Sequence, residues 1–556
     1  MPLIRKVESA MTWSLASQAF AGAPADDDDV QLYTAYEQWL RENSPGDPVE
    51  PLRNESPDVK TVTVGIVGGG HAGLYSAMLL LGQGVPGRNI TVFEASDRLG
   101  GRVYTHQFKA RQNDVTQYSD LGAMRLPDIP AHKIVFDVIA DLNVWLAQHT
   151  KPLLKQIPYH LSAPENLISV NGRKPISVVK AETNPELLGF PASATKDESQ
   201  RKHVSASGFM NLALHRFTSI KDPEKRLATI LSYDNISFSQ YLRAEMGWQA
   251  DRINYVETVL SATGNFDRAV PEVVLSRGEF DPNARWVTLA GGLGKLTAAM
   301  ADYLRAHNVA IHMTTPIAAV GETKDGKVPL TPANGTPRSF HRVILAIPTA
   351  PLRLMDTPAS WAVEKKAAMR RLATEDLYKV GLQFPKRWWD SPGGQSHTDR
   401  APWWLVYPSD PKMNTVLLYG WATDARNMAT LSQDQRLKVI TDAIRSLHPK
   451  VRQTDLKPLE TVEVFWGNTQ AGGIGHFGPG QFTDYYNIMQ RNEGYVSFAG
   501  EHLSLHHGWI AGACQSALLA VSHALGMIVN PIGFDAAPPP PRTETTTTHR
   551  AVKLVT

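Results

Sequence analysis

The amino-acid sequence predicts an α/β protein with a Rossmann-type dinucleotide-binding domain, a mixed-sheet domain and an inserted helical subdomain. Three observations predict this fold. Residues 61–106 contain a complete unit of strand, glycine turn, helix, second strand and acid, residues 131–286 have mainly helical patterns, and residues 351–487 contain alternating, aromatic-rich strands. The chain has 556 residues, which exceeds one ordinary hydrophobic core and therefore favours several structural regions.

The dinucleotide-binding unit begins with an apolar stretch at residues 61–67, which is typical of a buried parallel strand. Gly68, Gly70 and Gly73 follow with the spacing G-x-G-x-x-G and lead into an apolar helix at residues 72–81. Gly68 allows the tight turn, Gly70 lets the backbone approach a pyrophosphate, and Gly73 lets the helix lie close to the strand. The free N–H groups of the first helical turn then face the phosphates.

A second strand, predicted at residues 90–93, ends at Glu94. The Glu94 carboxylate can accept hydrogen bonds from the ribose hydroxyls of an adenosine, and it would repel a 2′-phosphate. The glycine pattern alone is compatible with a glycine-rich loop that binds nothing. Here, however, strand, glycines, helix, second strand and acid occur in order within about 30 residues, and this context predicts a bound dinucleotide.

The identity of the dinucleotide is indicated by residues 98–102, Arg-Leu-Gly-Gly-Arg, which lie a few positions beyond the acid. This segment resembles the second glycine-and-arginine motif of the flavin amine oxidase family, in which it lines the pyrophosphate and the flavin end of FAD. Nicotinamide-dependent dehydrogenases do not normally carry the motif. The resemblance therefore implies FAD as the cofactor.

The composition excludes several other classes of function. The formal net charge is +2 and no basic run forms the clustered patch that a phosphate backbone requires, so neither nucleic acid nor a membrane is expected as a partner. Cys514 is the only cysteine, which excludes an intrachain disulfide, a thiolate metal site and a dithiol redox centre. No apolar run is long enough for a transmembrane helix. Redox chemistry must therefore belong to a cofactor.

The two ends of the chain have their own patterns. Residues 1–24 faintly resemble a signal peptide, but polar residues interrupt the apolar part, and the plainer interpretation is an N-terminal helix or flexible lead. We therefore favour the cytoplasm and leave secretion open. A short helix is expected at residues 31–42, and residues 535–556 have the composition of a disordered tail. The expected organisation is a lead at 1–59, a discontinuous FAD-binding domain at 60–130, 287–350 and 488–532, a helical insertion at 131–286, a substrate-binding sheet domain at 351–487 and a tail at 533–556.

Arg125 is the one cation in the turn formed by residues 120–127, which a glycine and a proline bracket. Two interpretations remain open. A buried guanidinium commonly pairs with a carboxylate inside the protein. Alternatively, Arg125 is a bidentate clamp on the carboxylate of a substrate.

The middle of the chain is interpreted more coarsely. Residues 131–286 are expected to form helices joined by long polar connections, with few strands. After a glycine turn, the chain returns to the sheet through a helix that ends at His307 and a strand at residues 342–347. Between residues 378 and 421, alternating strands rich in Trp and Tyr predict a second sheet. These aromatic side chains either fill the core or form a wall that faces the flavin.

Near the C-terminus, a strand beginning at Val496 runs into a glycine–acid turn, and residues 506–513 lead into a final helix at 514–526. The positive end of this helix would lie against the pyrimidine side of the flavin and stabilise the negative charge that appears on reduction. His502 and His506 have a spacing that a metal can use on a helix. No third ligand accompanies them, so no metal site is predicted.

The whole set of motifs is similar to that of the L-amino-acid oxidases in the flavin amine oxidase superfamily, over about residues 60–530. The resemblance implies that Arg125 binds the substrate carboxylate and that Tyr407 shares it. It also implies that Gly508 offers its backbone carbonyl to the substrate amine and that Trp509 forms one wall of the cage over the flavin.

The resemblance further assigns Lys365 to the lysine that holds a water near flavin N5. The adjacent Lys366 is an alternative, and a solvated helix face is the plainer interpretation of both. Lys365 and Trp509 are thus the expected catalytic residues. The residues expected to contact FAD are Gly68, Gly70, His71, Ala72, Gly73, Glu94, Ala95, Arg98, Gly101, Arg102, Gly122, Ala123, Met124, Arg125, Ile317, Gly500, Glu501, Trp509 and Ile510.

The implied reaction is FAD-dependent oxidative deamination of L-amino acids to 2-oxo acids, with release of ammonia and hydrogen peroxide. Because the monoamine oxidases' flavin-linking cysteine has no counterpart, FAD is expected to be bound non-covalently. The expected partners are an L-amino acid and molecular oxygen, and the chain is expected to form a homodimer or homotetramer. An amine or polyamine oxidase and a non-catalytic flavoprotein scaffold remain as alternatives. The preferred substrate side chain stays open.

Overall fold

The structure of the protein is a computed structural model that describes residues 56–531 apart from 111–114, 198–201, 282 and 468–471. The helix expected at residues 31–42 and the tail expected at 535–556 lie outside the described residues. Within the described part of the chain, no helix is both long enough and apolar enough to cross a membrane.

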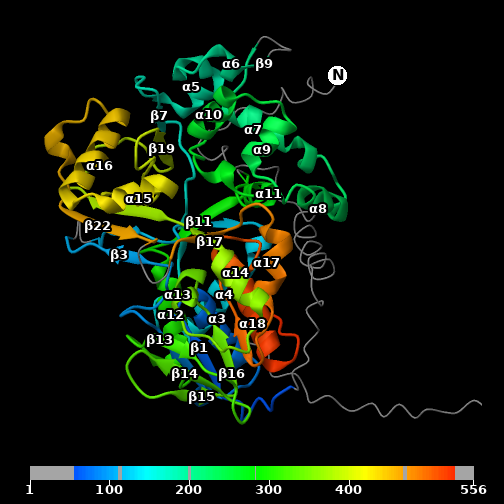
Figure 1. Ribbon diagram of the computed structural model, residues 1–556. Helices are drawn as coiled ribbons and strands as arrows, with labels where there is room; N and C mark the ends of the chain where they lie inside the picture. Colours follow the sequence, from blue (N-terminus) through cyan, green and yellow to red (C-terminus); the bar gives the residue numbers. More distant parts are fainter. Residues whose placement is uncertain (1–55, 111–114, 198–201, 282, 468–471, 532–556) are drawn as a thin grey trace, which may run out of the picture.

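A five-stranded parallel sheet lies in the lower half of the molecule in Figure 1, as the α/β prediction requires. Its strands come from segments far apart in the chain, because a parallel sheet needs crossover connections. The first strand, β1, pairs with β2 on one side and with β16 on the other, and the register is unbroken. The strand order is β12 (Ala310–His312), β2 (Ile90–Phe93), β1 (Val64–Val67), β16 (Arg342–Leu345) and β24 (Val496–Phe498).

Helix α3 (His71–Gly82) follows β1 and is buried along almost its whole length. A helix that is apolar all round must be covered on several sides, and α12 (Gly294–Ala306) and α18 (Ile510–Leu525) pack against it. The close approach of α3 to β1 depends on Gly73, since a Cβ there would lie 2.0 Å from the carbonyl oxygen of Gly68. The final helix begins at Ile510, four residues earlier than predicted.

A seven-stranded mixed sheet forms the second layer. Helices α15 (Ala422–Thr430) and α16 (Gln433–Leu447) cover one of its faces and close a separate apolar core. The other face borders a cavity. The strand order is β22 (Glu460–Phe465), β18 (Leu377–Gln383), β21 (Thr415–Trp421), β20 (Trp404–Val406), β19 (Gln395–Thr398), β7 (Leu167–Ser169) and β8 (Ile176–Ser177).

The insertion at residues 131–286 is less purely helical than predicted. Strands β7 and β8 belong to it by sequence, yet they extend the seven-stranded sheet through the pairing of β7 with β19. Strand β6 (Gln156–Pro158) pairs with β11 (Arg285–Leu289), which also pairs with β5 (Leu126–Asp128). Strands β6, β7 and β8, which lie within the insertion, are only two or three residues long, too short for their alternation to be visible in the sequence. Its helices include α4 (Lys133–Gln148), α7 (Ala206–Thr218), α9 (Phe238–Ala244) and α11 (Val270–Gly278).

Candidate active site

An elongated cavity of about 870 Å³ runs from the glycine turn after β1 to the open face of the seven-stranded sheet. This volume lies in the upper part of the range for small-molecule and cofactor sites. Nineteen of the residues predicted for cofactor or substrate line it: Gly68, Gly70, His71, Ala72, Glu94, Ala95, Arg98, Gly101, Arg102, Gly122, Ala123, Met124, Arg125, Ile317, Gly500, Glu501, Gly508, Trp509 and Ile510.

The dinucleotide end of the cavity is built from backbone. A Cβ added at Gly70 would lie 3.9 Å from the Cα of Gly101, so the two glycine motifs face each other with no side chain between them. The Glu94 carboxylate is held at the end of β2, where it accepts hydrogen bonds from the backbone N–H groups of Gly69 at 2.7 Å and Ser96 at 2.8 Å. The Ser96 hydroxyl also donates to this carboxylate at 2.6 Å, so about one of its four acceptor positions is left for a ribose hydroxyl.

Two helix N-termini open onto the same cavity. Helix α3 begins after Gly70 and α18 begins after Trp509, and no side chain caps either helix. The first N–H groups of a helix need partners, and the positive end of its dipole favours negative charge. A pyrophosphate at α3 and a flavin ring at α18 satisfy both requirements, so the residues present fit FAD.

Arg102 and Glu501 join the two motifs at the centre of the site. One terminal nitrogen of the guanidinium donates to the Glu501 carboxylate and to the carbonyl oxygen of Gly473. The second oxygen of Glu501 accepts from the N–H of Gly508 at 2.7 Å. Burial alone would raise the pKa of Glu501, but Arg102, two histidines and the Gly508 N–H lower it to about 2. Glu501 is therefore ionised and fixes the backbone that carries Gly508 and Trp509.

Arg125 lies in the same cavity without an acidic partner. Within the described residues, no carboxylate lies within ion-pair distance of its guanidinium, and the buried Nη1 atom has no hydrogen-bond partner. Burial would lower the pKa of Arg125, yet the neighbouring Tyr419 and Tyr159 raise it. The guanidinium also lies 5.1 Å from the centre of the Phe280 ring. The structure thus disfavours an ion pair between Arg125 and a carboxylate of the protein. The guanidinium can therefore accept an anionic ligand as its partner.

An aromatic wall stands beside Arg125. The Trp509 ring lies 5.4 Å from Phe280 and 6.2 Å from Trp286, measured between ring centres. On the sheet side, Tyr419 stacks on Trp404 at 6.3 Å. Phe280, Trp404 and Tyr419 line the cavity, whereas Trp286 packs behind the wall. Such a surface would keep water away from a ligand beside Arg125.

Lys379 is a site residue that the sequence motifs do not reveal. Its side chain is buried in the cavity, and Nζ donates to the carbonyl oxygen of Gly122 at 2.7 Å. Burial, followed by the nearby positive charge of Arg125, lowers the pKa of Lys379 to about 7 although Asp120 acts in the opposite direction. The available signal in the sequence is that Lys379 is the one charged residue in strand β18.

Lys365, which the resemblance assigns to the lysine near flavin N5, does not line the cavity. Lys365 lies on α14 (Val363–Arg371), away from the cavity, and its Nζ donates to the carbonyl oxygens of Met489 at 2.8 Å and Arg491 at 2.6 Å. The ammonium also lies 4.0 Å from the centre of the Phe498 ring. These contacts attach α14 to the end of α17 (Gln481–Gln490), so Lys365 has a structural role.

Tyr407, which the resemblance expects to share the substrate carboxylate with Arg125, does not line the cavity either. Its hydroxyl bonds to Ser396 at 2.9 Å and to the imidazole of His448 at 2.6 Å, within the core that α16 covers. The phenol beside Arg125 is that of Tyr419 instead. Side chains alternate between the two faces of a sheet, and Tyr407 belongs to the wrong face. Gly73, the third predicted residue outside the cavity, acts through the packing of α3 on β1.

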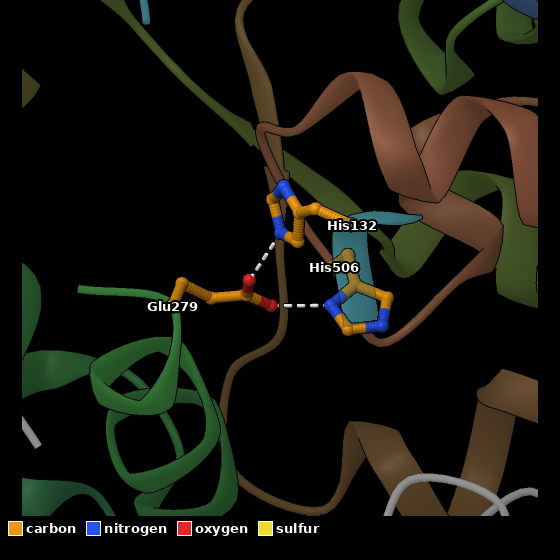
Figure 2. A group of neighbouring side chains, drawn as sticks. All are labelled: His132, Glu279 and His506. Atoms are coloured by element: carbon orange, nitrogen blue, oxygen red, sulfur yellow. Dashed lines mark hydrogen bonds and ion pairs between the residues drawn. The ribbon is translucent and has the colours of Figure 1, made fainter. Parts of the chain in front are cut away.

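The two histidines weighed as metal ligands have different neighbours. His506 contacts Glu279, which also contacts His132, and His502 does not belong to this group (Figure 2). The sequence could not show the group, because its three members are separated by more than a hundred residues along the chain. Glu279 thus joins two histidines from distant parts of the fold.

Comparison with known proteins agrees with this geometry. The family model for flavin-containing amine oxidoreductases matches residues 71–525. An L-amino-acid oxidase from Hebeloma cylindrosporum is 28% identical, with 83% of this chain and 81% of the relative covered. An L-amino-acid oxidase from Siganus canaliculatus is 27% identical, with coverage of 94% and 95%.

Two further similarities are coarser. A Dictyostelium discoideum protein whose assigned name is that of a bifunctional amine oxidase is 28% identical over 85% of this chain, but the match spans only 47% of that longer protein. A solved putrescine oxidase with bound putrescine superposes with a TM-score of 0.63 at 16% identity, covering 82% of this chain and 97% of the other. From the family match and the cavity together, the chain belongs to the flavin-containing amine oxidoreductases.

Proposed function

We propose that this protein is an L-amino-acid oxidase that uses non-covalently bound FAD. The observation that carries the proposal is Arg125, a buried cation in the cavity with an unpartnered Nη1 atom and no carboxylate within ion-pair distance among the described residues. A substrate carboxylate supplies the missing partner, and a guanidinium can hold it through two parallel hydrogen bonds. The names of the two L-amino-acid oxidase relatives support the same substrate class.

The residues of the chain divide the work of binding and orientation. Arg125, with the hydroxyls of Tyr419 and Tyr159 beside it, holds the carboxylate, and the Gly508 carbonyl accepts an N–H of the substrate amine. Trp509 and Phe280 exclude water and restrict the orientation of the Cα–H bond. Fixing this geometry is the main contribution of the protein to the rate.

Lys379 accepts the proton that the substrate ammonium loses. Its pKa of about 7 lets it exist as a neutral amine at physiological pH, and a neutral amine can accept a proton. When bound, FAD supplies the acceptor for the two electrons that leave the Cα–N unit, and oxygen takes them up as hydrogen peroxide. The imino acid is then hydrolysed to a 2-oxo acid and ammonia.

The absence of a covalent flavin link is part of the proposal. Cys514, the only cysteine, is buried in α18, where its sulfur lies 3.3 Å from Nε2 of His71. It does not line the cavity. Burial also raises the pKa of the thiol far above its usual range, which keeps it unreactive.

An amine oxidase is the second candidate, because the same fold occurs in the putrescine oxidase. Recognition of a diamine would require a free carboxylate at the substrate end of the cavity. Two carboxylates that line the cavity, those of Glu375 and Glu501, are already paired with arginines: Glu375 with Arg268 at 2.6 Å, and Glu501 with Arg102. These pairings favour the amino-acid assignment.

The test compares an amino acid with its matching decarboxylated amine under anaerobic conditions. We expect amino acids to bleach the yellow protein and the amines to leave it oxidised. Arg125→Ala should lower kcat/KM for the amino acid by about 30-fold to several thousand-fold, since truncating one side of a buried charged pair costs about 2–5 kcal/mol. Arg125→Lys should recover only part of the activity, because an ammonium lacks the planar fork.

A matched control is Arg285→Ala, which removes an exposed arginine that pairs with Asp128 at the surface. This variant should leave kcat/KM unchanged. Equal losses on the amino acid and on the amine in Arg125→Ala would show that Arg125 is structural and would refute the carboxylate clamp.

A further inference from the structure

Behind the aromatic wall lies a buried group of three side chains, His132, Glu279 and His506, which we call the carboxylate triad. The two oxygens of Glu279 point to different imidazoles: one contacts Nε2 of His132 and the other Nδ1 of His506 (Figure 2). The exposed fractions of the three side chains are 1%, 2% and 1%. A carboxylate so deeply buried must be held by its partners.

The triad joins three separate parts of the fold. His132 ends the short helix η3 (Pro130–His132) just before α4, and Glu279 follows α11 directly. His506 lies between η7 (Glu501–Leu503) and α18. Figure 2 shows the three side chains converging from these elements. Glu279 therefore connects the turn after Arg125, the end of the helical insertion and the segment that carries Trp509.

Each member of the triad touches or adjoins the wall of the cavity, but none lines the cavity itself. The His132 ring meets the Trp509 ring edge to face, with 4.9 Å between centres. The N–H of Trp509 donates to the carbonyl oxygen of His506 at 3.3 Å. Glu279 immediately precedes Phe280, whose ring lies against both Trp509 and Arg125. A shift of Glu279 would thus move the wall at more than one point.

The imidazole nitrogens and the carboxylate oxygens of the triad can be joined in two ways, by hydrogen bonds or by a shared metal ion. The ligand atoms lie within 4.8 Å of one another and are of types that metals bind. A structural zinc site needs four ligands, however, and a catalytic one needs three ligands with an open position for water. This group has three members, complete burial and direct contacts between the imidazole nitrogens and the carboxylate oxygens. Those contacts are hydrogen bonds, so the atoms that would bind an ion already serve as partners for one another.

We infer that Glu279 is a positioning residue that holds Trp509 and Phe280 in place through its hydrogen bonds to His132 and His506. The inference rests on the proposed function only in assigning Trp509 to the substrate cavity. Both imidazoles donate to Glu279, which accounts for the Nδ1 atom of His132: it is buried without a partner, as an unprotonated acceptor can be. The carboxylate stays ionised, because the imidazoles lower the pKa of Glu279 to about 2 against the effect of burial.

The first experiment is a double-mutant cycle between Glu279 and Trp509, with the anaerobic rate of flavin reduction at saturating substrate as the readout. Glu279→Ala in the otherwise unaltered protein should slow reduction by about 10- to 100-fold, since small displacements of a positioned reactant have effects of this size. In the Trp509→Ala protein the same substitution should slow reduction by a clearly smaller factor, because one of the two rings that Glu279 positions is already gone. Equal factors in both backgrounds would overturn the inference.

Two conservative variants keep the test informative if Glu279→Ala folds poorly. Glu279→Gln preserves shape and can still bond to both imidazoles after a change of tautomer, so it should retain most of the rate. His132→Phe keeps the edge-to-face contact with Trp509 while it removes the hydrogen bond, and it should retain more activity than His132→Ala. The matched control is Glu460→Gln, which alters the Glu460–His106 pair at 3.0 Å outside the cavity and should have no effect.

A second readout does not depend on activity. In protein labelled with fluorotryptophan, the fluorine resonance of Trp509 is identified by its loss in Trp509→Phe. This resonance should shift and broaden in Glu279→Ala but not in Glu460→Gln, and an unchanged resonance would contradict positioning. Stoichiometric zinc or iron that disappears in Glu279→Ala would instead make the triad a metal site and refute the hydrogen-bonded arrangement.

The cycle also separates the positioning role of Glu279 from the amino-acid assignment. It can be run with whichever substrate reduces the unaltered enzyme, whether an amino acid or an amine. If only amines react, the amino-acid assignment fails while the coupling between Glu279 and Trp509 can still be measured. If amino acids react and the coupling is absent, only the positioning role fails.

Discussion

The Nζ atom of Lys379 lies 2.7 Å from the carbonyl oxygen of Gly122, in the turn that leads to Arg125. Tyr419 stands directly opposite Lys379 on the neighbouring strand. The cavity therefore places an amine that can exchange protons near neutrality beside the cation proposed to bind the substrate.

We predict that Lys379→Met retains flavin but lowers kcat/KM by about a hundredfold, because a general acid–base group contributes roughly 10²–10⁴ in rate. Since its pKa is lowered to about 7, Lys379 is protonated below pH 7 and neutral above it. If the neutral form accepts the substrate proton, activity rises as pH increases through about 7. This rise should be absent from the pH profile of Lys379→Met, and an identical profile would argue against the role.

Tyr419→Phe and Tyr407→Phe form a matched pair that tests the corrected assignment. Tyr419→Phe removes a hydroxyl beside Arg125, and kcat/KM for an amino acid should fall by about 10- to 100-fold, as expected for a hydrogen bond to a charged group. Tyr407→Phe removes bonds to Ser396 and His448 away from the cavity, so it should lower stability by about 1–3 kcal/mol with little effect on kcat/KM. A loss of kcat/KM in Tyr407→Phe but not in Tyr419→Phe would show that Tyr407, rather than Tyr419, helps to bind the carboxylate.

Denaturation should release unmodified FAD into solution, because Cys514 lies outside the cavity and is deeply buried. Chromatography of the supernatant after precipitation in acid measures the release. In Glu94→Gln, the affinity for FAD should fall, since an amide accepts fewer hydrogen bonds from the ribose than a carboxylate does. Flavin that remains with the precipitated chain would contradict non-covalent binding.

Glu501 should make the protein sensitive to acid. Its pKa falls from 4.5 to about 2 on folding, so its contribution to stability is fully present above pH 4.5 and is lost as pH falls towards 2. The shift corresponds to about 3 kcal/mol. Urea unfolding between pH 3 and 6 should show this loss, and the slope should be smaller in Glu501→Gln. Parallel curves for the two proteins would show that Glu501 does not titrate as described.

The cofactor half of the site is predictable because its determinants are local. Gly68 and Gly70 are fixed by the geometry of one turn, and Glu94 follows from where the next strand ends, so adjacent residues carry the information. The substrate half depends on which face of a sheet looks into the cavity. Lys379, Tyr419 and Trp404 are paired across three strands and line the cavity together.

Strand alternation in the sequence identifies two sets of side chains, but it does not show which set is covered by helices. The choice is made by α15 and α16, which pack on the set that contains Tyr378 and Tyr407. For the same reason, the sequence does not show that Lys379 points into the cavity, and the choice of Lys365 rests on the family resemblance alone. The carboxylate triad is even harder to predict from the sequence, since its three members lie close together only in the folded chain.

The pairing of β7 with β19 limits how this protein can be shortened. Residues 167–177 lie within the helical insertion and yet supply the outer strands of the seven-stranded sheet. A chain engineered without the insertion would leave β19 as an open edge, with unpaired N–H and C=O groups available to other molecules. Such a truncated form should associate through that edge rather than behave as a minimal enzyme.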